Sequence, residues 1–297
     1  GLANVNLPKW SLANTQIGAK FEGVTMGGLN FSLNALHYRS QLPSLHGGKR
    51  ATNSFTGQYQ NAWPYLISFD MEFPRVNLLG GSMDFQSEAL GAAFRFEGAM
   101  TWGEEFANTN REQLYSKNRV WRSVIGVDRP TFVPWINPHR TTLFSAQLFW
   151  QHIFDHEREN GGVGERGIPD FKDNVIGTLL MKGFLAGDRI SPQLIIARDF
   201  RSRTHAIAPA LEWSTTDKLK FTFGANFKGG SNGGNSFDDC RSCNPFAPYT
   251  SGTYPGDPMV AYSRGLSGME PLGRFRAGPI GSAIREDEIF LTMRYKF

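Results

Sequence analysis

Two cysteines, Cys240 and Cys243, have the spacing that most directly suggests chemistry. They lie in the stretch DDCRSCNP, beside two aspartates. A zinc site needs four ligands, and no second CxxC pair or nearby histidine completes the set. We therefore expect a small disulfide, as in proteins of oxidising compartments, with free thiols or a partial metal site as the alternatives.

The histidine pair His152 and His156, in QHIFDHERE, is a second candidate. On a helix this spacing could bind zinc. In a strand the two side chains would lie about 13 Å apart, which is too far for one ion. We interpret the pair as the end of a strand entering a charged loop, and we predict no metal site.

Other short motifs do not support catalysis. The glycine-rich stretch 160–167 lacks the lysine and the strand–loop–helix context of a phosphate-binding loop. GLSGM at 265–269 does not match the G-x-S-x-G nucleophile motif. Spacing nominates no Ser–His pair and no paired acids. The sequence thus predicts a protein that is not an enzyme and needs no cofactor.

Alternation of apolar and polar residues is the main structural signal. In EIFLTMRYKF, which ends the printed sequence, Ile289 and Leu291 fall on one side and Thr292 and Arg294 on the other. The same alternation occurs in TQIGAKFEG, LNFSLNA, AFRFEGAM, LFSAQLFWQ, HAIAPALEW and KLKFTFGANF. Less regular strands are expected near 75–86, 119–128, 174–185 and 189–199; the first two have no evident outward face, and Gly80-Gly81 suggests a bulge.

Composition narrows the class of protein. The chain has 297 residues, 24 Phe, 33 Gly and a net charge of +4, which gives no support for nucleic-acid binding. It has no run of about 18 apolar residues, so a transmembrane helix is excluded. Strands with one apolar and one polar face fit a wall between lipid and water, if they close into a ring that pairs every amide. A soluble β-sandwich or barrel is the alternative fold.

Short and long connections alternate along the chain, as in bacterial outer-membrane barrels. The long ones are expected at 41–64, 103–117, 156–172 and 231–284. We predict an all-β fold, a porin-like antiparallel transmembrane β-barrel of roughly 11–12 strands, possibly part of a larger one. The whole chain, 1–297, would be one domain, with 231–284 as a long extracellular loop. Counting strands back from the end places the first one running inward, so we expect further strands before Gly1. A missed strand inside 41–74 or 244–284 would also restore the parity, and 65–73 is the best candidate.

The candidate functional residues are the polar residues on one side of these strands, because they would line the lumen of a barrel. They are Lys20, Glu22, Arg95, Glu97, Gln147, Gln151, Glu212, Lys220, Asn226, Arg294 and Lys296. Charges of both signs would set up a transverse field in a water-filled pore. The alternative is a salt-bridge network that plugs the interior.

Several stretches resemble a known family. They are GVDRPTFVPWINPHRTTLFSAQLFWQHIFDH, SPQLIIARDFRSRTHAIAPALEWSTTDKLKFTFGANFKGG and FPRVNLLGGSMDF followed by AFRFEGAMTWGEEF. These are similar to the C-terminal portion of the domain-of-unknown-function 1302 family of Gram-negative outer-membrane proteins. The resemblance spans roughly 10–230 and the last strand. It implies a porin-like barrel linked with export or uptake of hydrophobic compounds, and it supplies no catalytic residues. Tyr295 and Phe297 look like the terminal aromatic signal for outer-membrane assembly.

Two functions follow as expectations. The first is passive transport of small solutes across the outer membrane of a Gram-negative bacterium, with lipid and the assembly machinery as partners. The second is a structural or surface-interaction barrel that displays its loops or anchors a complex. The position of segment 231–284 would distinguish the two functions. A segment that constricts the lumen would favour transport, and one that contacts another chain, including a second copy of this one, would favour interaction.

Overall fold

The computed structural model of this protein describes residues 2–50, 67–108, 111, 113, 115–161, 164–168, 170–230, 280–281, 284 and 286–297. Nearly all of the predicted loop 231–284, with the Cys240–Cys243 pair, lies outside these residues. The described elements are strands, apart from the short 3-10 turn η1 (Leu12–Asn14). The prediction of an all-β fold is therefore confirmed. No described helix is long and apolar enough to cross a membrane.

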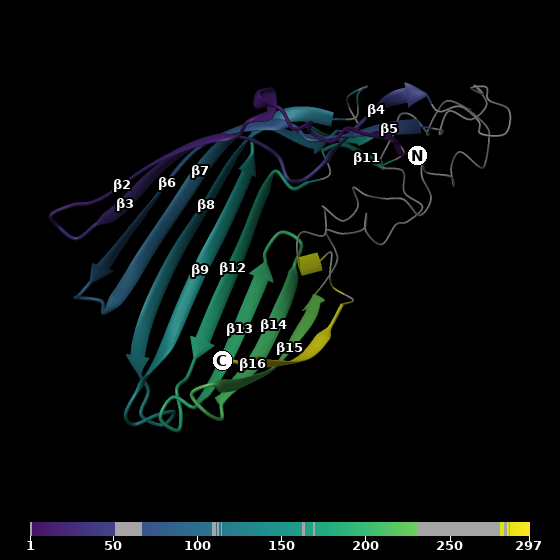
Figure 1. Ribbon diagram of the computed structural model, residues 1–297. Coiled ribbons are helices and arrows are strands. Elements are labelled where there is room, and N and C mark those ends of the chain that lie inside the picture. Colours follow the sequence, from purple (N-terminus) through teal and green to yellow (C-terminus); the bar gives the residue numbers. More distant parts are fainter. Residues whose placement is uncertain are drawn as a thin grey trace.

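Eleven strands form one large sheet. They are β2 (Ile17–Val24), β3 (Asn30–Arg39), β6 (Arg75–Ser87), β7 (Ala92–Ala107), β8 (Tyr115–Phe132), β9 (Thr141–Ile153), β12 (Asp173–Lys182), β13 (Ile190–Asp199), β14 (Thr204–Ser214), β15 (Leu219–Gly230) and β16 (Glu288–Tyr295). Neighbours pair antiparallel in chain order, so the sheet is a continuous meander. Figure 1 shows it as one curved wall, with β2 and β16 at its edges.

The connections divide between the two ends of this wall. One end, the turn end, carries the connections 25–29, 88–91, 133–140, 183–189 and 215–218. The opposite loop end carries 40–74, 108–114, 154–172, 200–203 and 231–287. Except for the short 200–203 connection and the longer 133–140 one, this matches the expected alternation of short and long connections.

Five further strands lie in the loop-end connections and at the N-terminus, where the sequence pattern predicts mostly loops. β1 (Leu2–Val5), β5 (Ile67–Glu72) and β4 (Ser44–Arg50) form a small sheet, in the order β1-β5-β4. β10 (Arg158–Gly161) and β11 (Gly164–Gly167) form a hairpin. The strand considered at 65–73 thus exists as β5, but it joins the small sheet and not the large one. Figure 1 shows β4, β5 and β11 gathered beyond the loop end.

The cross-strand register assigns each side chain of the large sheet to one of two faces. One row of directly paired residues runs through Lys20, Asn34, Gly80, Ala99, Arg122, Gln151 and Asn174. We call the side that carries this row the polar face. The opposite, apolar face carries Phe21, Leu33, Leu148, Phe223 and Leu291, all at least two-fifths exposed. Outward exposure of this kind is unusual for a domain that buries one side of its sheet as a core.

The glycine pair Gly80-Gly81 does not form the expected bulge, because the register of β6 runs unbroken through both residues. The pair instead permits close approach of strands: a Cβ on Gly81 would lie 2.7 Å from the carbonyl oxygen of Ser32. The register shift on this part of the sheet is in β7, between Trp102 and Glu104.

Candidate functional site on the polar face of the sheet

The sequence-predicted polar residues all lie in or next to strands of the large sheet. Lys20, Glu22, Arg95, Glu97, Gln147, Gln151, Glu212, Lys220, Asn226 and Arg294 share the polar face. Lys296 lies just past the end of β16, where its backbone N–H donates to the carbonyl oxygen of Lys218 at 2.8 Å. The structure therefore brings ten of the eleven residues onto one surface, and their role in lining a lumen stays a prediction.

A hollow of about 950 Å³ lies on the polar face between β2 and β12. Its polar lining includes Lys20, Asn34, Glu97, Arg122, Gln151 and Asn174. Apolar side chains from Phe149, Phe171 and Ile176 also line it. A solute in this hollow would meet hydrogen-bonding groups and an apolar surface together.

Arg122 is the centre of the polar contacts at the loop side of this hollow. Its guanidinium donates to Glu104 Oε2 at 2.7 Å and to Gln151 Oε1 at 3.0 Å. Thr101 also donates its hydroxyl to Glu104. These charge-assisted bonds hold the guanidinium against the wall.

The two halves of the polar face differ in charge near the turn end. Among the described residues, the β2–β8 half carries four carboxylates and two cations: Glu22, Asp84, Glu97 and Asp128, with Lys20 and Arg95. The β12–β16 half carries three cations and one carboxylate: Lys182, Lys220 and Arg294, with Glu212. Arcs of opposite sign on one curved surface give an electric field across the space between them.

Ion pairs connect members of each half. Arg95 Nη2 lies 2.9 Å from Asp128 Oδ2. Glu212 Oε2 lies 3.2 Å from Lys182 Nζ and 3.3 Å from Lys220 Nζ. Because two lysines share one carboxylate, this cluster keeps a net positive charge.

Segment 154–172, between β9 and β12, folds over the polar face at the loop end. Val120 and Ile153 belong to that face, yet both are fully buried. Such burial needs cover on the polar side. Ile168 and Phe171 of the segment are buried at the same end, as is Val76 of β6. Phe171 and its neighbour Asp170 also line the hollow. A loop-end segment thus narrows the space along the polar face.

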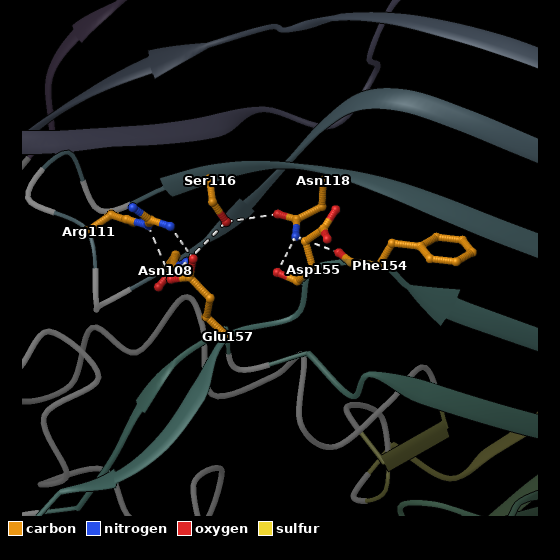
Figure 2. Close-up of polar contacts among 7 residues, drawn as sticks. All are labelled: Asn108, Arg111, Ser116, Asn118, Phe154, Asp155 and Glu157. Carbon is orange, nitrogen blue, oxygen red and sulfur yellow. Dashed lines mark hydrogen bonds and ion pairs between the residues drawn. The ribbon is translucent and has the colours of Figure 1, made fainter.

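Polar contacts anchor the start of this segment to the β7–β8 connection and to the start of β8 (Figure 2). Asn118 Nδ2 donates to the carbonyl oxygens of Phe154 and Asp155, at 2.8 and 3.1 Å. Asn108, which is fully buried, donates to Glu157 Oε2 at 3.0 Å. The Arg111 guanidinium donates to both oxygens of the same carboxylate. The hydrogen bond from Arg111 is the main reason that the pKa of Glu157 lies below its ordinary value.

Sequence reasoning missed Glu104, Arg122, Asp128, Lys182 and Phe171. Arg122 and Asp128 lie in a strand whose outward face the pattern does not reveal, and Glu104 follows a register shift. Lys182 ends one of the less regular strands, and alternation gave no clear signal because its face also carries the apolar Leu180. Nothing in the local sequence marks Phe171, because its position depends on the folding of a loop.

The remaining candidates fall outside the hollow. Tyr295 and Phe297 are exposed, with ring centroids 5.3 Å apart, and Tyr295 lies on the apolar face of edge strand β16. His152 Nδ1 lies 2.6 Å from Asp173 Oδ1, whereas His156 Nε2 donates to the carbonyl oxygen of Asp170 at 2.7 Å. Within the described ranges, no three His, Cys, Asp or Glu side chains gather as a metal site requires.

Comparison with known protein families gives one match. A family model described as "Protein of unknown function (DUF1302)" matches residues 2–244, which is most of the chain. A comparison with curated proteins gives no match. The matched range contains ten of the eleven large-sheet strands and the whole hollow. The chain therefore belongs to the DUF1302 family of proteins of unknown function.

Proposed function

We propose that this protein is a transmembrane β-barrel of the outer membrane of a Gram-negative bacterium, and that small solutes cross passively along its polar face. The observation that carries the proposal is the division of an eleven-stranded antiparallel sheet into an exposed apolar face and a charged polar face. Such a sheet is stable where one face meets lipid and the other meets water.

Aromatic side chains at both ends of the apolar face support a membrane setting. Trp102 and Trp150 lie toward the loop end, and Phe94 and Trp213 toward the turn end. On β7, Phe94 and Trp102 are about 27 Å apart along the strand. With a tilt of about 40° this gives about 20 Å across the membrane, close to the apolar band of known barrels.

The two edge strands need partners in a membrane, because lipid cannot satisfy their unpaired amides. In the described part of the chain, β2 and β16 each pair on one side only. With eleven antiparallel strands both run from the loop end to the turn end, so direct contact between them would be parallel. The proposal requires each edge to be paired, directly or through other strands.

The polar face supports selection of solutes by charge and by polarity. Its two halves carry opposite excess charge, and the hollow combines Arg122 and Gln151 with Phe149 and Ile176. Solutes that carry both a polar group and an apolar part fit this lining. The family resemblance to transport of hydrophobic compounds is compatible with such a lining.

The first test is conductance of the detergent-purified full chain in a planar bilayer, with Lys220→Glu as the variant. A change of two charge units about 5 Å from a passing ion amounts to about 1.7 kcal/mol in water before screening. We therefore expect the cation-to-anion permeability ratio to rise by at least about fivefold at low salt and less at high salt. Reversal potentials in a salt gradient measure this ratio.

Lys218→Glu is the matched control, because Lys218 is exposed in the β14–β15 turn and lies outside the polar face. It should leave the ratio nearly unchanged. Discrete steps with equal selectivity in all three proteins would contradict the role of the polar face. Silence from folded protein would contradict an open pore and favour the surface-interaction alternative, whose loop 231–284 lies largely beyond the described residues.

A further inference from the structure

A second hollow, of about 600 Å³, lies at the loop end beside the β13–β14 connection. Its lining includes four basic side chains: His156, Arg158, Lys172 and Arg201. One acidic side chain, Asp173, and the apolar Val175 and Phe200 complete it. The lining thus carries more basic than acidic side chains, a composition that suits an anionic ligand.

Backbone contacts fix the positions of two of these residues, Lys172 and Arg201. The carbonyl oxygen of Lys172 accepts from the N–H of Ile153 at 2.8 Å. The buried Asp199 carboxylate accepts from the N–H of Arg201 at 3.0 Å, which fixes the tight β13–β14 turn. In the described part of the chain, neither Lys172 Nζ nor the Arg201 guanidinium has a hydrogen bond or ion pair, although Arg201 lies over the ring of Phe171 at 5.4 Å.

The single carboxylate of this hollow is already engaged. Asp173 Oδ1 accepts from Trp150 Nε1 at 3.2 Å and lies 2.6 Å from His152 Nδ1. These partners draw the Asp173 carboxylate toward Trp150 and His152. Lys172 acts on this carboxylate only electrostatically, and within the described ranges the two residues form no ion pair with each other.

The hollow borders the apolar face of the sheet. Val175 belongs to that face, since it pairs with Trp150. Phe200 is more than half exposed and lies against Gly177, with its ring 3.2 Å from where a Cβ would be. A molecule in the hollow would contact cations on one side and exposed apolar side chains on the other.

We propose that this hollow binds the phosphate of an anionic lipid in the leaflet at the loop end, with the acyl chains against Val175 and Phe200. The proposal rests on the membrane setting argued under Proposed function. Arginine and lysine bind phosphate oxygens through charge-assisted hydrogen bonds, and basic pockets at membrane surfaces recognise anionic headgroups. A freely soluble anion would use the cations and gain nothing from the neighbouring apolar surface.

The test is native mass spectrometry of the full chain released from micelles that contain either phosphatidic acid or phosphatidylcholine. The variant is Lys172→Gln with Arg201→Gln, and the control is Arg189→Gln with Lys218→Gln, which removes the same charge at the turn end. Each basic side chain near an anionic lipid contributes a factor of about five. We expect the variant to retain phosphatidic acid at least tenfold less than wild type, and the control to match wild type.

Equal retention of phosphatidic acid by the variant and wild type would overturn the proposal. Displacement of the lipid by inorganic phosphate alone would also overturn it, because the hollow would then be a free-phosphate site. A heat-sensitive shift in gel mobility checks that each variant is folded. Conductance of the same proteins is measured separately. If wild type conducts but does not retain the lipid, only this site is rejected. If wild type retains the lipid but does not conduct, only the pore is rejected.

Discussion

Glu157 is the residue whose environment makes the sharpest prediction outside the strands. Its carboxylate accepts hydrogen bonds from Arg111 and Asn108, and it lies at the start of segment 154–172. The pKa of Glu157 is lowered, mainly by the hydrogen bond from Arg111. The ionised carboxylate is therefore the form that stabilises the folded segment.

A pH titration should reveal this stabilisation. Because the folded pKa is depressed, the contribution is complete above the usual Glu pKa of about 4.3 and is lost as pH falls through the lower folded value. The N–H of Ile168, which donates to the carbonyl oxygen of Glu157 at 2.8 Å, is the reporter. We expect its hydrogen-exchange protection, corrected for intrinsic rates, to fall toward acid pH in wild type and to be low and nearly pH-independent in Glu157→Gln.

Glu88→Gln is the control for this titration, because Glu88 is exposed in the β6–β7 turn at the far end of the sheet. In Glu88→Gln, the hydrogen-exchange protection of Ile168 should depend on pH as it does in wild type. An unchanged acid response in Glu157→Gln would show that another group controls the opening of the segment.

At the scale of the strands, close approach of β3, β6 and β7 depends on the glycines of β6. A Cβ on Gly81 would lie 2.7 Å from a backbone oxygen of β3, and one on Gly80 would lie 2.9 Å from the carbonyl oxygen of Gly98 in β7. Backbone atoms cannot rotate away as a flexible side chain can. The strands would have to separate to accommodate a larger residue.

Gly81→Ala should therefore lower the free energy of unfolding by about 1–3 kcal/mol, the usual cost of overpacking. Urea unfolding of protein refolded in detergent measures the change. Gly126→Ala is the matched control, because its Cβ would have no neighbour nearer than 3.6 Å. It should change stability by less than about 0.5 kcal/mol. Equal effects of the two substitutions would mean that the sheet relaxes around Gly81 without strain.

The whole molecule presents an apolar face that water cannot solvate favourably. Side chains such as Phe21, Leu33, Ile125 and Leu291 are more than half exposed there, and contiguous exposed apolar surface of this kind marks an interaction site. The same sheet carries charged side chains on its other face, which would be costly to bury in a core. The two faces together are what the proposed position between lipid and water would require.

Solubility tests this conclusion directly. We expect the full chain to require detergent for extraction and to show a folded form in unheated gels that heating converts to a slower-migrating one. Removal of detergent should precipitate it. Extraction into aqueous buffer as a monodisperse folded protein would favour the soluble β-barrel or sandwich instead.

The sequence by itself determined the strands of the large sheet and, for the regular ones, their two faces. Alternation is local, so Lys220, Arg294 and Glu212 could be placed on one side without knowing their neighbours. The family resemblance was equally accessible, because it depends on stretches of sequence and is confirmed over residues 2–244.

Only the tertiary structure decided the rest. The faces of β6 and β8 depend on register with their neighbours, because their own patterns mix apolar residues such as Val120 with charged ones such as Arg122 on one side. The ion pairs and the inward position of Phe171 join residues from separate connections and strands. The cationic hollow likewise combines Lys172 of one connection with Arg201 of another. Contacts between distant segments arise from the packing of the sheet and its loops, so the local spacing of residues in the sequence does not predict them.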